Sequence, residues 1–364
     1  MMVFVVAGHA DFGVFDVAGM FPYYSFHVGA FVFISGYFYR QEEEDNPIGY
    51  LKKKAVHLLL PYFTWNLLYG LFAWGLRSLG FAIGSPVNFK TLFIEPFLGG
   101  HQYGFNFSAW FVPALFLLEL MNLLARKLLS FKKLPKDLLL FVLSLAAGGM
   151  TVLLSQRGSV WGYYRHIGCL LFLFPIFQAG QVYRLQLEGK VQKLSTGMYL
   201  TIVCGLQYLV LLYSRGQVAY SAVWCSGFLH GPAVAYLTTF LGIAFWLKIA
   251  GILTPIWKEG SLLDRIGRNT FSIMMHHILG FFVLNLVFSV FYKSGLAGGF
   301  STESFRMTYE YRYLIFGMEN GKWLYLIAGI GIPFLIKAVQ DKLAGQIQNA
   351  LSKNPKTENN TNVR

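Results

Sequence analysis

Residues 270–292 read TFSIMMHHILGFFVLNLVFSVFY, an apolar stretch that contains two adjacent histidines. A helix of about 20 apolar residues is long enough to cross the hydrocarbon core of a bilayer. Stretches of similar character occur near residues 1–20, 24–39, 58–82, 108–125, 137–155, 166–183, 195–213, 227–247 and 323–340. The sequence therefore predicts an all-α, polytopic membrane protein with about ten transmembrane helices.

The composition supports a single membrane domain. Of the 364 residues, 55% are hydrophobic and only 13% are charged, whereas a soluble domain carries about 25% charged residues. We expect residues 1–345 to form one integral-membrane domain, because the apolar stretches run through that whole range. The polar residues 346–364 are predicted to form a disordered cytoplasmic tail.

The formal net charge of +13 raises the question of a nucleic-acid partner. Most of the lysines and arginines fall in loops that lie on one side of the membrane if the first helix runs outward from the cytoplasm. This distribution is the positive-inside pattern of multi-pass membrane proteins. We therefore expect a cytoplasmic C-terminus and no nucleic-acid partner.

The first apolar stretch is short for a spanning helix. Only eight residues precede His9, and at about 1.5 Å per residue they cannot cross the bilayer core. No basic region or small-residue cleavage site of a signal peptide is present. We expect the first helix to be truncated relative to the natural reading frame.

Histidines lie in or beside several apolar stretches, at His9, His27 and the pair His276 and His277. Ionisable groups at membrane depth are costly and are candidate functional residues. The alternative is a structural hydrogen bond to a neighbouring helix. Cysteines and histidines do not occur at zinc-site spacing, so no metal site is predicted. The three cysteines are expected in the membrane core: Cys169, Cys204 and Cys225.

Several short sequence words, in order along the chain, resemble the acyltransferase 3 family of bacterial integral-membrane acyltransferases. Residues 26–39, FHVGAFVFISGYFY, resemble the second-helix signature of that family, and VFVVAGHA places His9 where its first helix carries a functional histidine. Further words agree at 52–70 (KKKAVHLLLPYFTWNLLYG), 109–119 (AWFVPALFLLE), 172–180 (FLFPIFQAG) and 266–277 (IGRNTFSIMMHH). Together they cover nearly the whole chain.

The resemblance implies transfer of an acyl group, most often acetyl, from cytoplasmic acyl-coenzyme A to a hydroxyl of a cell-envelope or exported carbohydrate. The acceptor could be a lipid-linked glycan, and the setting would be the bacterial inner membrane. His9 would be the catalytic residue, as a general base or as an acyl acceptor. Substrate-binding residues would be His27, Ser35, Trp110 and His277, and donor-binding residues would be Arg40, Lys52, Lys53 and Lys54.

Each of these roles has a structural alternative. Ser35 precedes Gly36, and such pairs often mark close helix packing, while Trp110 could belong to the interfacial aromatic belt. Topology alone could explain the basic residues, although Glu119 in an apolar stretch could pair with one of them. His276 is expected to have a packing role outside the site. The mixed-charge loop 293–322 could cover an outer entrance or be a solvated connector.

The chain also departs from the family pattern. The basic residue that usually lies about ten positions before the first-helix histidine has no counterpart here, and His57 and Met274 replace residues that are usually basic and aromatic. Two other function classes fit a polytopic chain with intramembrane histidines. One is a transporter or flippase of a lipid-linked sugar, in which the histidines relay protons. The other is a membrane scaffold or sensor.

Overall fold

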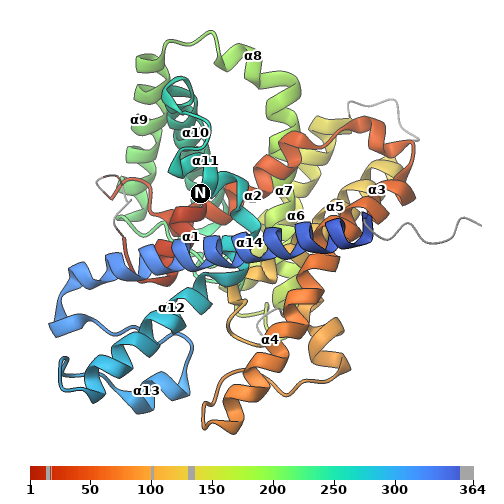
Figure 1. The fold of residues 1–364 in the computed structure, drawn as a ribbon. Coiled ribbons are helices and arrows are strands. Elements are labelled where there is room, and N and C mark those ends of the chain that lie inside the picture. Colours follow the sequence, from red (N-terminus) through yellow and green to blue (C-terminus); the bar gives the residue numbers. More distant parts are fainter. Residues whose placement is uncertain (14–16, 18, 100–101, 130–135, 353–364) are drawn as a thin grey trace, which may run out of the picture.

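The computed structural model describes residues 1–13, 17, 19–99, 102–129 and 136–352. Every long element in these ranges is a helix, and Figure 1 shows their arrangement. The helices are α1 (Met2–His9), α2 (His27–Phe38), α3 (Pro47–Lys54), α4 (Leu60–Ser78), α5 (Phe111–Leu129), α6 (Lys136–Gln156), α7 (Tyr164–Val182), α8 (Glu188–Val191), α9 (Thr196–Ser214), α10 (Gly231–Leu253), α11 (Leu262–Arg268), α12 (Thr270–Lys293), α13 (Thr302–Met307) and α14 (Lys322–Ser352).

The predicted all-α, polytopic class is confirmed. Within the described ranges, seven helices are long and apolar enough to cross a membrane. The three N-terminal stretches predicted to span fall outside this group, and two of them form short helices: α1 has 8 residues and α2 has 12. The seven segments are Phe107–Leu129, Lys136–Gln156, Tyr164–Val191, Thr196–Ser214, Gly231–Ile256, Thr270–Lys293 and Glu319–Gln346.

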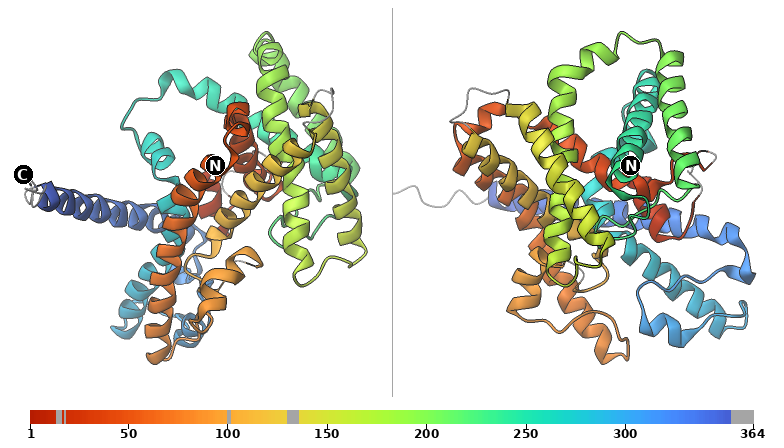
Figure 2. Two further views of the ribbon diagram at one scale, coloured as in Figure 1. Left: turned by 90° about the vertical axis from the view of Figure 1, so that its right-hand side faces the viewer. Right: turned by 180° about the vertical axis from the view of Figure 1, so that it is seen from behind.

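The C-terminal helix α14 is the longest, with 31 residues. It continues through Ser352 into the range predicted as a polar tail, and residues 353–364 lie outside the described part of the chain. The left view of Figure 2 shows the C-terminal end of α14 extending away from the other helices. Its N-terminal half packs against α12.

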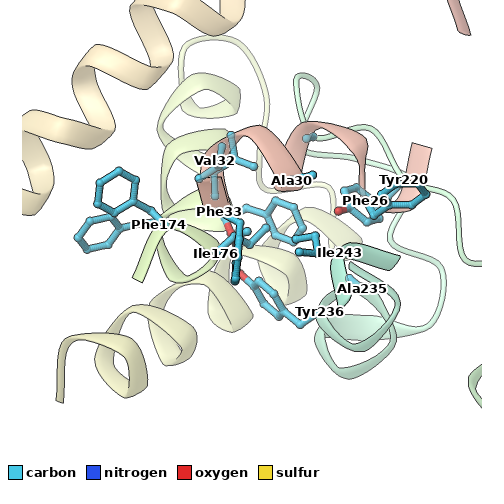
Figure 3. Close-up of a cluster of buried hydrophobic side chains, with 14 of the residues drawn as sticks. Phe26, Ala30, Val32, Phe33, Phe174, Ile176, Tyr220, Ala235, Tyr236 and Ile243 are labelled. Carbon is cyan, nitrogen blue, oxygen red and sulfur yellow. Dashed lines mark hydrogen bonds between the residues drawn. The ribbon is translucent and has the colours of Figure 1, made fainter. Parts of the chain in front are cut away.

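Buried hydrophobic side chains form two clusters. The first joins α2, α5, α6, α7, α9 and α10, and Figure 3 shows Ala30 and Phe33 of α2 in it with Ile176 of α7 and Tyr236 of α10. The second joins α4, α12, α13 and α14. Helix α1 contributes to both clusters, through Phe4 to the first and through its neighbours Val6 and Ala7 to the second. Helix α1 therefore lies where the two clusters meet.

Helices α2 and α7 approach each other unusually closely. A Cβ atom on Gly36 would lie 1.9 Å from the carbonyl oxygen of Phe177, and one on Gly180 would lie 2.1 Å from the carbonyl oxygen of Phe33. Any side chain at either position would overlap the facing backbone. This reciprocal contact is the close packing that small residues permit between membrane helices, and Gly36 rather than Ser35 makes it.

A buried ion pair fixes α3 against α5 near the end of the bundle that carries the exposed Arg40, Lys52 and Lys53, here called the basic end. The carboxylate of Glu119 is fully buried, and Nζ of Lys54 donates to it at 2.6 Å. The hydroxyl of Tyr50 donates to the same carboxylate. Burial, together with the adjacent Glu119, raises the pKa of the Tyr50 phenol above its usual value. The expected pairing of Glu119 with a basic residue is thus present, and its partner is Lys54.

A second buried network holds the segment that follows α2. Arg126 of α5 is 1% exposed and donates to Glu44 at 3.0 Å and to Asp137 at the start of α6. Its guanidinium also donates to Gln181 of α7 and lies over the ring of Tyr39, 5.3 Å from the centroid. Because a buried guanidinium needs several acceptors, these contacts fix the C-terminal end of α2.

Candidate active site

A cavity of about 330 Å³ lies between α1, α2, the turn Phe107–Trp110 and the start of α12. Four residues predicted for the site line it: His9, His27, Ser35 and Trp110. The rest of the wall is mostly apolar, with Met2, Val28, Phe31, Leu58, Phe111 and Met274 among its residues. A site of this kind has few polar groups in apolar surroundings, which is typical of pockets that bind and orient a small molecule.

Ser108 connects the two histidines that the sequence places furthest apart. Its Oγ lies 2.8 Å from Nε2 of His9 and 3.2 Å from Nε2 of His277. The two imidazole rings are 5.1 Å apart between centroids. His277 does not line the cavity, and it meets the site through the Ser108 hydroxyl and the ring of His9.

The backbone determines the direction of these hydrogen bonds. Nδ1 of His277 lies 2.9 Å from the carbonyl oxygen of Ile273, and a carbonyl only accepts, so Nδ1 carries the proton. Nε2 of a neutral His277 then accepts from the Ser108 hydroxyl, and the Ser108 oxygen accepts from Nε2 of His9. In this arrangement a neutral His9 carries its proton on Nε2 and its lone pair on Nδ1.

His27 is held at the first turn of α2. Its Nδ1 donates to the carbonyl oxygen of Tyr23 at 2.6 Å, which leaves Nε2 as the acceptor nitrogen of the neutral ring. The ring packs edge-on against Tyr23 and Tyr24. The Tyr24 hydroxyl donates to the carbonyl oxygen of Gly8 at 3.2 Å, so the segment before α2 is tied to the end of α1 beside His9.

Arg312, from the long loop before α14, reaches the same helix end. Its Nε donates to the carbonyl oxygen of His9 at 3.0 Å, and its Nη1 donates to the carbonyls of Tyr309 and Tyr311. The guanidinium lies over the ring of Phe281 at 4.4 Å. Burial lowers the pKa of Arg312 to about 10, so the side chain stays positively charged at neutral pH.

Other predicted residues lie away from the cavity. His276 faces α4, where its Nδ1 lies 2.6 Å from the Tyr69 hydroxyl and its ring packs on Trp65. Among the predicted donor-binding residues, Lys54 forms an ion pair with Glu119. The other three are exposed: Arg40, Lys52 and Lys53. They follow α2 or lie on α3.

Sequence reasoning did not identify Ser108 or Arg312 as site residues. Ser108 directly precedes the segment 109–119 that resembles the family. Its hydroxyl at the start of an apolar run is the signal that the sequence offers. Arg312 lies in the mixed-charge loop 293–322, where the sequence does not distinguish it from the other charged residues. Within the described ranges, no group of three or more His, Cys, Asp or Glu residues could hold a metal ion.

Comparison with known proteins identifies the family of the chain. A family model described as an acyltransferase domain, that of the acyltransferase 3 family, matches residues 1–338. No curated protein and no solved structure matches the chain significantly. The match includes the cavity and both hydrophobic clusters, and it covers nearly all the helices. The chain therefore belongs to the acyltransferase 3 family and is a multi-pass membrane acyltransferase.

Proposed function

We propose that this acyltransferase moves an acyl group, most often acetyl, from acyl-coenzyme A to a hydroxyl of a carbohydrate, with His9 as general base. The observation that carries the proposal is the hydrogen-bonded series His9, Ser108 and His277 beside the cavity. In this series His277 orients His9 through the Ser108 hydroxyl. Acyl-transfer sites commonly have a base that is held in this way by a further group.

In the proposed reaction, Nδ1 of His9 takes the proton of the acceptor hydroxyl as the oxygen attacks the thioester carbonyl. Collapse of the tetrahedral intermediate breaks the C–S bond, and the leaving thiolate of coenzyme A takes the proton from the imidazolium. Ser108 keeps Nε2 of His9 engaged while the ring is positively charged. His27 and Ser35, on the facing helix, would bind the substrates.

A two-step route uses the same residue. His9 would attack the thioester, release the thiol of coenzyme A and carry the acyl group until the acceptor hydroxyl displaces it. Rapid quenching of the enzyme with labelled donor, in the absence of acceptor, distinguishes the routes. Label bound covalently to His9 supports the acyl-histidine route, and protein that stays unlabelled in the quench but turns over once acceptor is added supports the general-base route.

The donor is proposed to approach from the basic end of the bundle. Arg40, Lys52 and Lys53 are exposed there, and their charges suit the phosphates of coenzyme A. Because Lys54 is paired with Glu119, we assign Lys54 a structural role. The basic end would face the cytoplasm of a bacterial cell, with the C-terminus on the same side of the inner membrane.

The test compares wild type with His9→Ala in membranes supplied with labelled acetyl-coenzyme A and a panel of cell-envelope glycans. The matched control is His230→Ala, a half-buried histidine away from the cavity that contacts Gln217. We expect acylated glycan with wild type and with the control, and a loss of about 100-fold or more with His9→Ala. Glycan that crosses the bilayer without becoming acylated, with wild type, would favour a transporter instead.

A further inference from the structure

A second cavity, of about 640 Å³, lies at the basic end of the bundle between α2, α8, α9 and α10. The proposed reaction does not use it. One wall includes Tyr183, which opens a single turn of π-helix between α7 and α8. Such turns are rare and frequently occur at functional sites. The cavity is therefore a separate feature that needs its own explanation.

The cavity is bordered by apolar side chains that are exposed on the surface of the helix bundle. Phe38 is 69% exposed and Ile252 is 45% exposed, and both line it. In a multi-pass membrane protein, exposed apolar side chains of this kind contact lipid hydrocarbon. An occupant with hydrocarbon chains could extend along these residues.

Two opposite charges lie inside the cavity without neutralising each other. The carboxylate of Glu188 accepts a hydrogen bond from the Tyr37 hydroxyl at 2.9 Å. The ammonium of Lys248 lies over the Tyr199 ring, 5.3 Å from its centroid. Among the described residues, no carboxylate lies within ion-pair distance of the Lys248 ammonium. A partly buried charge without a partner is costly, so each of these groups favours a ligand of the opposite charge.

We propose that the cavity binds one amine-headed phospholipid, of the phosphatidylethanolamine type. Its phosphate would pair with Lys248, its ammonium would donate to Glu188, and its acyl chains would lie along Phe38 and Ile252. An anionic glycerol-headed lipid satisfies Lys248 alone. A choline-headed lipid matches both charges but has no N–H to donate to Glu188. The two fixed charges thus select the zwitterion that carries a primary amine.

Gly251 offers a way to fill this cavity. It lines the cavity one helical turn from Lys248, and a Cβ atom built on it meets no other atom within 4 Å. Gly251→Trp should therefore occupy the space without disturbing helix packing. A matched control is Gly149→Trp, which enters an uncharged apolar cavity of about 660 Å³ between α6 and α10.

Native mass spectrometry of the purified full chain, after reconstitution with equal amounts of ethanolamine-, glycerol- and choline-headed phospholipids, tests the proposal. We expect wild type and Gly149→Trp to retain the ethanolamine lipid about tenfold over the others, a difference near 1.4 kcal/mol. Gly251→Trp should lose it, Lys248→Gln should lose it, Lys248→Arg should keep it, and Glu188→Gln should remove the preference for the amine.

Equal retention of the three lipids by wild type would overturn the proposal. So would a preference that survives both Gly251→Trp and Lys248→Gln. If Gly251→Trp does not yield a monodisperse protein, the pair Lys248→Gln and Lys248→Arg decides the outcome. Both replacements are long polar side chains near the C-terminal end of α10, and only Lys248→Arg keeps the charge. None of these measurements depends on acyl transfer.

Discussion

Nε of Arg312 donates a hydrogen bond of 3.0 Å to the carbonyl oxygen of His9, a residue 303 positions earlier in the chain. The last carbonyls of a helix have no partner within the helix, and Arg312 supplies one at the end of α1. A cation at this helix terminus is also favoured electrostatically. Loop 293–322 therefore does more than connect two helices, since it fixes the backbone that carries His9.

Replacement of Arg312 should slow acyl transfer through the position of His9. We expect Arg312→Gln to lower kcat about tenfold, with little change in KM, because misplacement of a catalytic group affects the transition state most. Arg312→Lys should recover part of the loss, since it keeps the charge. The control is Arg306→Gln in the same loop, whose side chain is exposed and lies over Phe81. A change in KM alone would contradict a positioning role.

The Ser108 hydroxyl should matter for kcat. Ser108→Ala breaks the connection between His9 and His277, and we expect kcat to fall about 10-fold to 100-fold, a fraction of the usual contribution of general base catalysis. The control is Ser272→Ala on α12, because its buried hydroxyl donates to the Pro333 carbonyl away from the cavity. Steady-state kinetics with labelled donor measures both. Equal losses in the two variants would indicate a packing effect.

The contact between α2 and α7 should tolerate no side chain at Gly36. We expect Gly36→Ala to lower the free energy of unfolding by about 1–3 kcal/mol, since its Cβ would overlap the Phe177 carbonyl. The control is Gly197→Ala on α9, where a Cβ meets nothing within 4 Å. This control should be neutral or stabilising by up to about 1 kcal/mol. Thermal unfolding in detergent separates them, and equal midpoints would contradict the close approach.

Removal of the Glu119 charge should destabilise the basic end. Glu119→Gln leaves the Lys54 ammonium without its partner, and we expect a loss of about 3 kcal/mol, whereas Asp341→Asn, in the exposed pair with Lys337, should cost under about 0.5 kcal/mol. The raised pKa of Tyr50 keeps its phenol protonated in the folded chain. Wild-type stability should therefore hold at neutral pH and decline above about pH 10, where the unfolded phenol ionises. Denaturant titration across pH 7–11 checks both statements.

The sequence predicted the residues that share one helix face better than it predicted those that meet across the fold. His27, Phe31 and Ser35 recur every four positions, so one face of a helix necessarily carries them together, and they do line one cavity. Their neighbour Gly36 falls on another face, which explains how the Ser-Gly pair serves both a site and a helix contact.

The residues missed by sequence reasoning depend on long-range contacts. Ser108 meets His9 across 99 positions and His277 across 169, and no periodicity in the sequence reports such a meeting. The number of spanning helices was harder to predict for a related reason. Helices α1 and α2 are apolar but short, and the hydropathy of a stretch does not show where a turn will end the helix.

Helix α2 presents three faces with three tasks. Gly36 closes on α7, Ser35 and His27 face the first cavity, and Tyr37 and Phe38 face the second, while Ile34 borders both. Inserting a single residue near the middle of α2 would rotate everything beyond it by about 100° and misdirect all three faces at once. A substitution on α2 affects only the face that carries it, whereas an insertion or a deletion affects all three faces, so its length of 12 residues is as constrained as its chemistry.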